Sequence, residues 1–361
     1  MRKPYGLVLA GGGAKGAYQL GAWKAFRELG IRFNAISGVS IGAINGALIA
    51  QNAYKEAIEL WDTVRVEDSV KIESDLPDPD NLFSKKNYPV LLREFIKEKG
   101  IDASPTQEFV AQYINEEKIR ESGIDYGLIA YNVTQRKPVE LFLDDIPEGE
   151  LTNMVFASAK YPFISNVGPK DEWYLDGGVY DNVPISMLRK RGINRLVIVD
   201  ISEHKGIAHQ DELYRSEIVY IRPYRVSDLG EAFEFDNEKL DFRIQLGYLD
   251  TKKAFGMLNG YIFYFSPHTF RVMVKKYGAD GVRELEQLAL ELDIDRLTIY
   301  RERTFMAVLR RRYKEYELQR ELEREEEQET LVKKIKSRFI RETDEKYPLA
   351  TKILTSDEYE K

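Results

Sequence analysis

The sequence contains no cysteine and only three histidines among its 361 residues. The missing cysteines exclude disulfide bonds, a thiolate nucleophile and cysteine-based metal sites, and they are compatible with a reducing compartment. An excess of positive charge is also missing, since 53 Lys and Arg residues are outnumbered by 60 Asp and Glu residues, which gives a formal net charge of −7. Because there is no basic surplus to meet phosphates, we do not expect nucleic acid as the main partner.

Long apolar runs are missing as well. The longest weakly polar run, residues 35–50, contains Ser37, Ser40 and Asn45 and is too short to span a bilayer. Residues 1–6 lead into an apolar segment without the apolar core and small-residue cleavage site of a signal peptide. We therefore expect a cytoplasmic protein without a transmembrane segment, and we leave peripheral contact with a membrane open.

The strongest pattern in the chain lies in residues 7–51. A short apolar run at its start is typical of a strand buried on both faces, and three glycines, Gly11 to Gly13, follow it. A helix is predicted over residues 17–29, then a strand over residues 33–36 and a second helix rich in small residues. This order of strand, glycine loop, helix, strand and helix predicts the start of a parallel α/β sheet.

Residues 38–42, Gly-Val-Ser-Ile-Gly, fit the pattern G-x-S-x-G, in which a serine stands on a sharp turn between a strand and a helix. Glycine is needed on both sides of the serine, because a Cβ there would collide with the neighbouring strand and helix. Such a turn holds Ser40 Oγ above the sheet, at the positive end of the helix dipole. The pattern therefore indicates a serine nucleophile and is favoured over an ordinary glycine-rich turn.

Residues 11–16, Gly-Gly-Gly-Ala-Lys-Gly, also fit the dinucleotide-binding pattern G-x-G-x-x-G. That kind of loop requires an acidic residue about twenty positions further on, at the end of the second strand. The second strand here ends in Asn34-Ala35-Ile36-Ser37, without an acid, and no Gly-Lys-Ser/Thr follows to make a P-loop. The remaining interpretation is a glycine loop whose N–H groups, beside a serine, form an oxyanion hole.

Three ordered motifs together resemble the patatin-like phospholipases: the glycine loop at residues 11–16, Gly-Val-Ser-Ile-Gly at 38–42 and Asp-Gly-Gly at 176–178. The similarity covers about residues 5–200 and, more loosely, residues 246–255. It implies a three-layer α/β/α sheet with a nucleophile elbow. It also implies a lipid acyl hydrolase, phospholipase A-like, that works without a metal or cofactor on a lipid acyl ester at a membrane or micelle surface.

The resemblance implies a Ser–Asp dyad, with Ser40 as the nucleophile and Asp176 as the general base. An ordinary aspartate, with a pKa of about 3.9, is a poor base toward a hydroxyl, so we expect partial desolvation to raise the pKa of Asp176. The backbone N–H groups of Gly11, Gly12 and Gly13 are expected to hold the oxyanion. The supporting motif residues are Gly16, Gly38, Gly42, Gly177, Gly178 and Asn182.

Lys15 lies inside the glycine motif. Its two functional interpretations are that it holds the loop or meets a phosphate head group. A solvent-facing lysine without either role is the favoured interpretation, because most lysines are exposed.

The remaining sequence predicts two domains. Residues 1–265 are predicted as the catalytic domain and residues 266–361 as a helical, strongly charged extension whose role the sequence leaves open. Within the first, residues 64–122 are either a mobile helical cap over the site or a plain surface excursion. The oligomeric state is also open.

Three further segments carry predictions of secondary structure. Residues 202–241 are polar and are predicted as a loop, whereas residues 295–339 are predicted as helix, with ion pairs along its charged surface. The apolar aromatic run at residues 256–265 is predicted as a buried edge strand in preference to a segment that touches lipid.

Three alternative functions stay open. An acyltransferase would use the same dyad and pass the acyl group to an alcohol or a lysolipid. A catalytically silent lipid-binding module would keep the fold without the chemistry, although all three motifs are intact. A Ser-His-Asp esterase would need one of the three histidines, His204, His209 or His268, as its base.

The dyad predicts that the separate substitutions His204→Ala, His209→Ala and His268→Ala leave ester hydrolysis intact, because no imidazole takes the serine proton. The measurement is kcat/KM on a p-nitrophenyl acyl ester for each variant beside the unaltered protein. A loss of several orders of magnitude in one folded variant would restore the Ser-His-Asp esterase.

Overall fold

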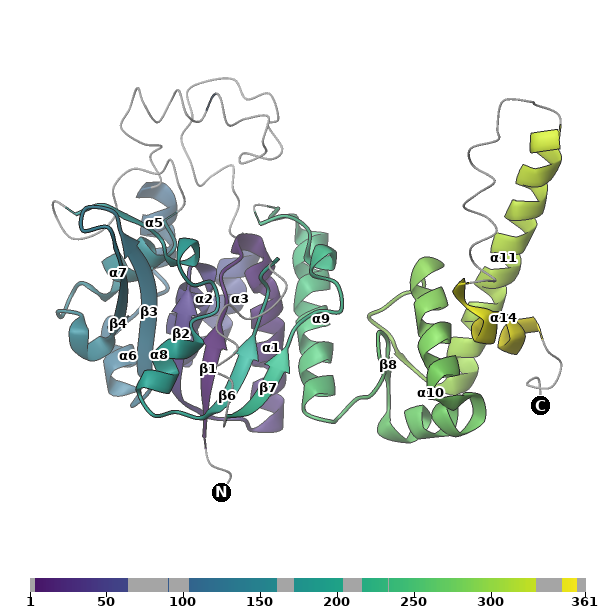
Figure 1. The fold of residues 1–361 in the computed structure, drawn as a ribbon. Helices are drawn as coiled ribbons and strands as arrows, with labels where there is room; N and C mark the ends of the chain where they lie inside the picture. Colours follow the sequence, from purple (N-terminus) through teal and green to yellow (C-terminus); the bar gives the residue numbers. More distant parts are fainter. Residues whose placement is uncertain are drawn as a thin grey trace. The chain divides into compact units, whose positions relative to one another are not determined.

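The computed structural model describes residues 4–63, 90, 104–160, 172–203, 216–232, 234–328 and 346–355. Contacts between residues divide the chain into two compact units, Met1–Thr251 and Lys252–Lys361 (Figure 1). The domain boundary predicted near residue 265 stays a prediction, as does the cap over residues 64–122, most of which lies outside the described residues. None of the described helices is long and apolar enough to cross a membrane.

A seven-stranded sheet forms the centre of the first unit in the part of the chain that the structure describes (Figure 1). The strands β1, β2, β3, β6 and β7 pair in parallel, while β4 and β5 run antiparallel to β3. In spatial order they are β4 (Lys137–Phe142), β3 (Asp125–Asn132), β2 (Phe33–Val39), β1 (Tyr5–Leu9), β6 (Arg195–Val199) and β7 (Glu217–Ile221), with β5 (Tyr174–Asp176) paired to β3 outside this order.

Helices cover both faces of this sheet. On one face, the Tyr126 hydroxyl of β3 donates a 2.7 Å hydrogen bond to a carbonyl of α2 (Ile41–Ala50). On the other face, Ser37 Oγ of β2 donates a 2.8 Å bond to the carbonyl of Pro184, just before α8 (Ile185–Lys190). Because successive strand residues point to opposite faces, one sheet meets two helical layers. The predicted three-layer α/β/α fold is confirmed.

The other described elements of this unit connect the strands and extend the helical layers. The predicted helix over residues 17–29 is present with these bounds as α1. The helices are α1 (Ala17–Leu29), α3 (Tyr54–Thr63), α5 (Ser104–Ala111), α6 (Glu116–Glu121), α7 (Leu151–Ser158) and α9 (Asn237–Ala254), and the 3₁₀ turns are η1 (Gly13–Gly16), η2 (Leu143–Asp145), η3 (Gly177–Val179) and η5 (Val226–Leu229).

The prediction of an uninterrupted loop over residues 202–241 is wrong, because this stretch contains strand β7. Among the described strands it pairs with β6 alone and forms one edge of the sheet. Its Glu217 and Tyr220 side chains are exposed, and Glu217 forms a 2.9 Å ion pair with Arg195 of β6. An edge strand is covered less than a central one, so its sequence looks polar although its backbone is paired.

The second unit is built around a small aromatic core. A two-stranded sheet, β8 (Tyr264–Phe265) with β9 (Ile299–Tyr300), packs against the helices α10 (Pro267–Glu291) and α11 (Glu302–Gln328), and α14 (Pro348–Thr355) packs against α10. Residues 262–265 are at most 1% exposed. The burial predicted for residues 256–265 is therefore confirmed for the last four residues but not for the whole run, because Met257 is 49% exposed, and the strand has only two residues.

The prediction of helix from residue 295 onward is wrong at its start, because α11 begins at Glu302. The residues just before it form β9, which pairs in parallel with β8. A contact with a strand far along the chain thus overrides the local helical pattern. The same helix carries side chains that pair on its surface, since Arg311 and Arg312 lie 3.9 Å and 3.6 Å from Glu315.

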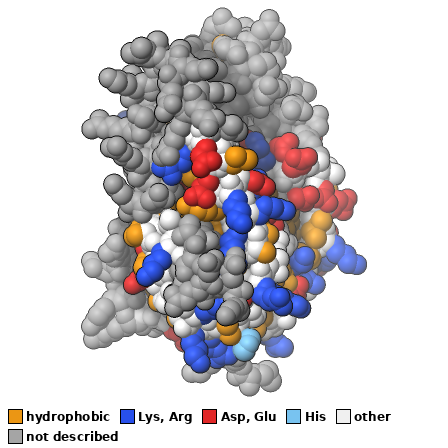
Figure 2. Space-filling view, turned by 90° about the vertical axis from the view of Figure 1, so that its right-hand side faces the viewer, with side chains coloured by type: hydrophobic (Ala, Val, Ile, Leu, Met, Phe, Trp, Pro, Cys, Tyr) orange, Lys and Arg blue, Asp and Glu red, His pale blue; other side chains and the backbone are white. Residues whose placement is uncertain are grey.

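Charged residues of both signs reach the surface. Figure 2 shows one face of the molecule, on which Lys and Arg, Asp and Glu and scattered hydrophobic side chains are all exposed. This mixture agrees with the 31% of charged residues in the composition.

Helices α1 and α9 of the first unit cross at two glycines. A Cβ on Gly21 would lie 1.8 Å from the carbonyl oxygen of Ile244, and one on Gly247 would lie 2.0 Å from that of Tyr18. The Tyr18 hydroxyl also donates a 2.8 Å hydrogen bond to Asp250. The two helix backbones therefore approach more closely than any other residue type would allow.

We predict that Gly247→Ala destabilises the protein by about 1–3 kcal/mol, because the added methyl group forces α9 away from α1. Helix propensity alone would give the opposite sign, a gain of about 1 kcal/mol. The measurement is the free energy of unfolding in urea, with Asp241→Ala on the exposed side of α9 as the control, expected within about 0.5 kcal/mol of the unaltered protein. A stabilised Gly247→Ala variant would contradict the crossing.

Candidate active site

Ser40 occupies the tight turn between β2 and α2. Its φ of 57° and ψ of −128° lie in a sparsely populated backbone region, and such strain costs on the order of 1–3 kcal/mol. The flanking glycines make the turn possible. A Cβ on Gly38 would lie 2.3 Å from the carbonyl oxygen of Gly42, and one on Gly42 would lie 2.3 Å from that of Leu9.

The backbone of this turn is fastened by Ser158 at the end of α7. The Ser40 N–H donates a 3.0 Å hydrogen bond to Ser158 Oγ, and the Ser158 hydroxyl donates a 2.6 Å bond to the carbonyl of Ile129 in β3. Ser158 is fully buried. It ties the strained turn to the central sheet, a role that the sequence pattern did not reveal.

Asp176 reaches Ser40 because β2 and β5 share one edge of β3. Strand β4 occupies the other edge, so β2 and β5 follow one another along the remaining one. Val39 is opposite Ile129 and Asp176 is opposite Ala130, the next residue of β3. The aspartate therefore continues the line of β2 just beyond its end, where Ser40 stands.

The Asp176 carboxyl accepts a 2.7 Å hydrogen bond from the Gly178 N–H. Burial raises the pKa of Asp176 to about 6, and the neighbouring Ser40 side chain and this hydrogen bond oppose part of the rise. Glycine is required next to Asp176, because a Cβ on Gly177 would lie only 2.2 Å from the Ile129 carbonyl oxygen. Asp176 is thus ionised at neutral pH yet more basic than an ordinary aspartate.

The glycine loop lies beside this pair, and Asn182 fastens it. The Gly11 N–H donates a 3.3 Å bond to the Asn182 carbonyl, and Asn182 Nδ2 donates a 3.2 Å bond to the Gly11 carbonyl. The N–H groups of Gly12 and Gly13 have no acceptor among the described residues. Of the three amides expected to hold an oxyanion, those of Gly12 and Gly13 are therefore the ones left for a ligand.

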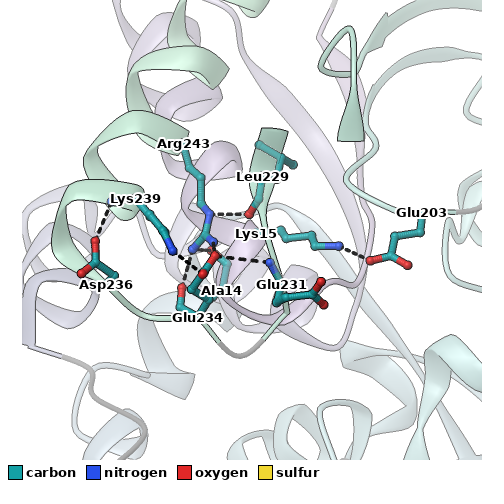
Figure 3. Close-up of polar contacts among 9 residues, drawn as sticks. All are labelled: Ala14, Lys15, Glu203, Leu229, Glu231, Glu234, Asp236, Lys239 and Arg243. Carbon is teal, nitrogen blue, oxygen red and sulfur yellow. Dashed lines mark hydrogen bonds and ion pairs between the residues drawn. The ribbon is translucent and has the colours of Figure 1, made fainter. Parts of the chain in front are cut away.

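Lys15 does not face solvent. Its side chain is only 3% exposed, and its Nζ lies 2.5 Å from an Oε1 of Glu203 (Figure 3). The prediction that Lys15 faces solvent is wrong. The stem of its side chain packs inside the loop, and only its ammonium reaches an exposed carboxylate.

A buried polar network supports the other side of the glycine loop. Gln19 Nε2 donates a 2.7 Å bond to the Ala10 carbonyl, and Asn45 Nδ2 donates to Gln19 Oε1 at 2.9 Å and to the Gly16 carbonyl at 3.1 Å. The indole N–H of Trp61 completes the network with a 3.1 Å bond to Asn45 Oδ1. Sequence analysis missed these residues. The available signal was an amide side chain in each of two helices made mostly of small and apolar residues.

Of the three histidines, the structure describes one. His268 is in the first turn of α10, in the second unit. His204 and His209 lie outside the described residues. Within the first unit, the described residues place Asp176 beside Ser40 and include no histidine.

Fold and site combine a mostly parallel α/β sheet, a serine on a strained strand-to-helix turn, and a partly buried carboxyl beside a glycine loop, an arrangement typical of serine hydrolases. The family model described as "Patatin-like phospholipase" matches residues 7–189, and the chain belongs to this family. The matched region contains the glycine loop, Ser40 and Asp176.

Two curated relatives illustrate the similarity. "Probable lipid hydrolase 463L" of Invertebrate iridescent virus 6 is 31% identical over 195 residues, 51% of this chain and 63% of that protein. "Patatin-like phospholipase domain-containing protein 7" of Rattus norvegicus is 26% identical over 196 residues, 54% of this chain and 13% of that protein. The matched part of the chain thus spans less than two thirds of the length of these relatives.

Among solved structures, VipD from Legionella pneumophila is similar with a TM-score of 0.40 at 15% sequence identity. The match covers 99% of this chain and 81% of that chain.

The raised pKa of Asp176 predicts the pH dependence of ester hydrolysis. With Asp176 as the base, only its ionised carboxyl could accept the serine proton, so we expect kcat/KM to rise with pH, to be half-maximal near the pKa of about 6 and to level off above it. The measurement is a pH–rate profile of kcat/KM between about pH 4.5 and about pH 8.5. An acid limb centred near pH 4, the ordinary range of aspartate, would contradict the effect of burial.

Proposed function

We propose that this protein is a serine lipid acyl hydrolase, phospholipase A-like, that cleaves acyl esters through a dyad of Ser40 and Asp176. The observation that carries the proposal is the position of Asp176 just beyond the end of β2, beside Ser40, together with the burial that raises the pKa of its carboxyl to about 6. A hydroxyl needs a nearby base to become a nucleophile, and this carboxyl is both close to Ser40 and more basic than an ordinary aspartate.

In the first step, Ser40 Oγ attacks the ester carbonyl carbon while Asp176 takes the hydroxyl proton. The carbonyl oxygen becomes an oxyanion, which the N–H groups of Gly12 and Gly13 stabilise. The tetrahedral intermediate then expels the alcohol or lysolipid, whose oxygen receives the proton from Asp176. The product left on the protein is an acyl ester of Ser40.

In the second step, a water molecule gives a proton to Asp176 and attacks the acyl carbon. The Ser40–acyl bond breaks, the fatty acid leaves, and the proton passes from Asp176 back to Ser40 Oγ. Each proton transfer uses the same carboxyl, so the cycle needs no histidine. We propose no metal or cofactor for it.

The substrate class is proposed from the family. Relatives are named lipid hydrolase, patatin-like phospholipase and lysophospholipase, which supports a lipid acyl ester presented at a membrane or micelle surface. We propose that the protein acts in the cytoplasm and meets lipid only peripherally. Lys15 is assigned to holding the glycine loop, because the carboxylate of Glu203 already neutralises its ammonium.

We predict that Ser40→Ala and Asp176→Asn each lower kcat by about 10³-fold or more, because one removes the nucleophile and the other the base. The measurement is hydrolysis of p-nitrophenyl acyl esters of increasing chain length and of a phospholipid in mixed micelles. Asp144→Asn, the same change at an exposed position in η2, is the control and keeps full activity.

Two outcomes would change the proposal. A folded Asp176→Asn variant that keeps most of its activity would place the base elsewhere and bring the histidines back. An unaltered protein that is inert on every ester, in soluble and micellar form, would reject hydrolysis in favour of a lipid-binding module. Product analysis with an added lysolipid or alcohol acceptor separates acyl transfer from hydrolysis.

A further inference from the structure

A buried arginine on α9 organises the chain segment that precedes this helix. Arg243 is 1% exposed. Its Nε donates a 2.6 Å hydrogen bond to the Leu229 carbonyl, and its Nη1 donates a 2.6 Å bond to the Glu234 carbonyl (Figure 3). Its Nη2 lies 3.1 Å from the Glu234 carboxylate. One guanidinium therefore holds both ends of the stretch from Leu229 to Glu234; the described residues of this stretch, 229–232 and 234, are called the 229–234 segment below.

The 229–234 segment lies directly on the glycine loop. The Ala14 N–H donates a 2.6 Å hydrogen bond to the Ala232 carbonyl, and the Ala14 carbonyl accepts a 3.5 Å bond from Arg243 Nη1. A Cβ on Gly13, whose φ is 57°, would lie 2.1 Å from the Ala232 carbonyl oxygen. Both polar backbone groups of Ala14 are thus held from outside the loop.

The chain just beyond the segment has a second anchor. The Phe235 ring stacks on Trp61 with centroids 6.3 Å apart and an interplanar angle of 23°. Trp61 donates to Asn45, which in turn donates to the Gly16 carbonyl at the far end of the glycine loop. The segment and the polar network therefore hold the loop at two separate points.

Docking of α9 does not explain the cluster. The crossing of α9 with α1 is made by Gly21 and Gly247, and by the 2.8 Å hydrogen bond of Tyr18 to Asp250. None of these contacts involves Arg243, whose hydrogen bonds go to the 229–234 segment and to Ala14. Burying a guanidinium is costly, and burial lowers the pKa of Arg243.

We propose that Arg243 is a positioning residue for the oxyanion hole, which holds the 229–234 segment against the glycine loop and so fixes the N–H groups of Gly12 and Gly13. This inference rests on the proposed function. A loop of consecutive glycines has no side chains to hold its own shape, yet an oxyanion hole needs donors aimed before the reaction begins. The planar fork of arginine reaches several carbonyls at once, whereas a lysine ammonium acts as a single point charge.

The test is Arg243→Lys, which keeps the charge and removes the fork. Loss of one oxyanion donor typically costs about 10²–10³ in kcat, so we expect loosened donors to lower kcat by about 10–100-fold, with KM within about 3-fold. Lys239→Met is the matched control, because Lys239 pairs with the same Glu234 carboxylate from the exposed side and makes no contact with the loop; its kcat stays unchanged. Phe235→Ala loosens the second anchor without touching a buried charge and lowers kcat in the same way, should Arg243→Lys fail to fold.

Amide hydrogen exchange gives a readout that needs no turnover. In Arg243→Lys, or in Phe235→Ala in its place, we expect faster exchange in the peptide spanning residues 11–16, where Ala14 loses its bond to Ala232. Peptides from α1 and β1 are expected to exchange as in the unaltered protein. Unchanged exchange in the glycine loop, a general rise in exchange, or a change in KM alone would overturn the inference.

The two proposals can fail separately. Hydrolysis by the unaltered protein together with full kcat in Arg243→Lys would reject the role of Arg243 and leave the hydrolase proposal standing. An inert unaltered protein would reject the hydrolase proposal, and the exchange experiment would then decide alone whether Arg243 fixes the loop.

Discussion

The backbone strain at Ser40 is the constraint on which the rest of the site depends. A φ of 57° at a residue with a side chain persists only where the surroundings hold it. Because Gly38 and Gly42 have no Cβ, the backbones of β2, α2 and β1 can approach more closely than side chains would allow. Ser158 accepts the hydrogen bond of the Ser40 N–H. The side chain is thereby presented at the carboxyl end of β2, where the other elements of the site converge.

The burial of Asp176 exchanges stability for basicity. Its folded pKa of about 6 lies above the ordinary value of about 3.9, so the folded state loses stability as the pH rises from about 4 to about 6, where the carboxyl ionises first in the unfolded chain. The same desolvation makes the carboxyl a usable base without an imidazole. A similar balance applies to the glycine loop. Its glycines leave the N–H groups accessible, but they provide no side chains that could hold the loop in one conformation. Asn182, Asn45 and Arg243 supply that support from other parts of the chain.

Local patterns in the sequence were sufficient for the first part of the fold. The helix at residues 17–29 and the serine on a turn between strand and helix were both predicted, because each depends on neighbours within a few positions. The order of the motifs identified the family. The absence of an acidic residue at the end of the second strand also argued against the dinucleotide-binding interpretation.

By itself, then, the sequence determined the class of fold and the residue types of the site, because turns, caps and hydrophobic periods are short-range properties. Only the tertiary structure decided that β7 closes the sheet edge, that Lys15 is buried against Glu203, and that the Gly11 amide is taken by Asn182. It also decided that Val39 and Asp176 lie opposite successive residues of β3, Ile129 and Ala130. These facts depend on strand register and burial between residues far apart in the chain, which no local pattern encodes.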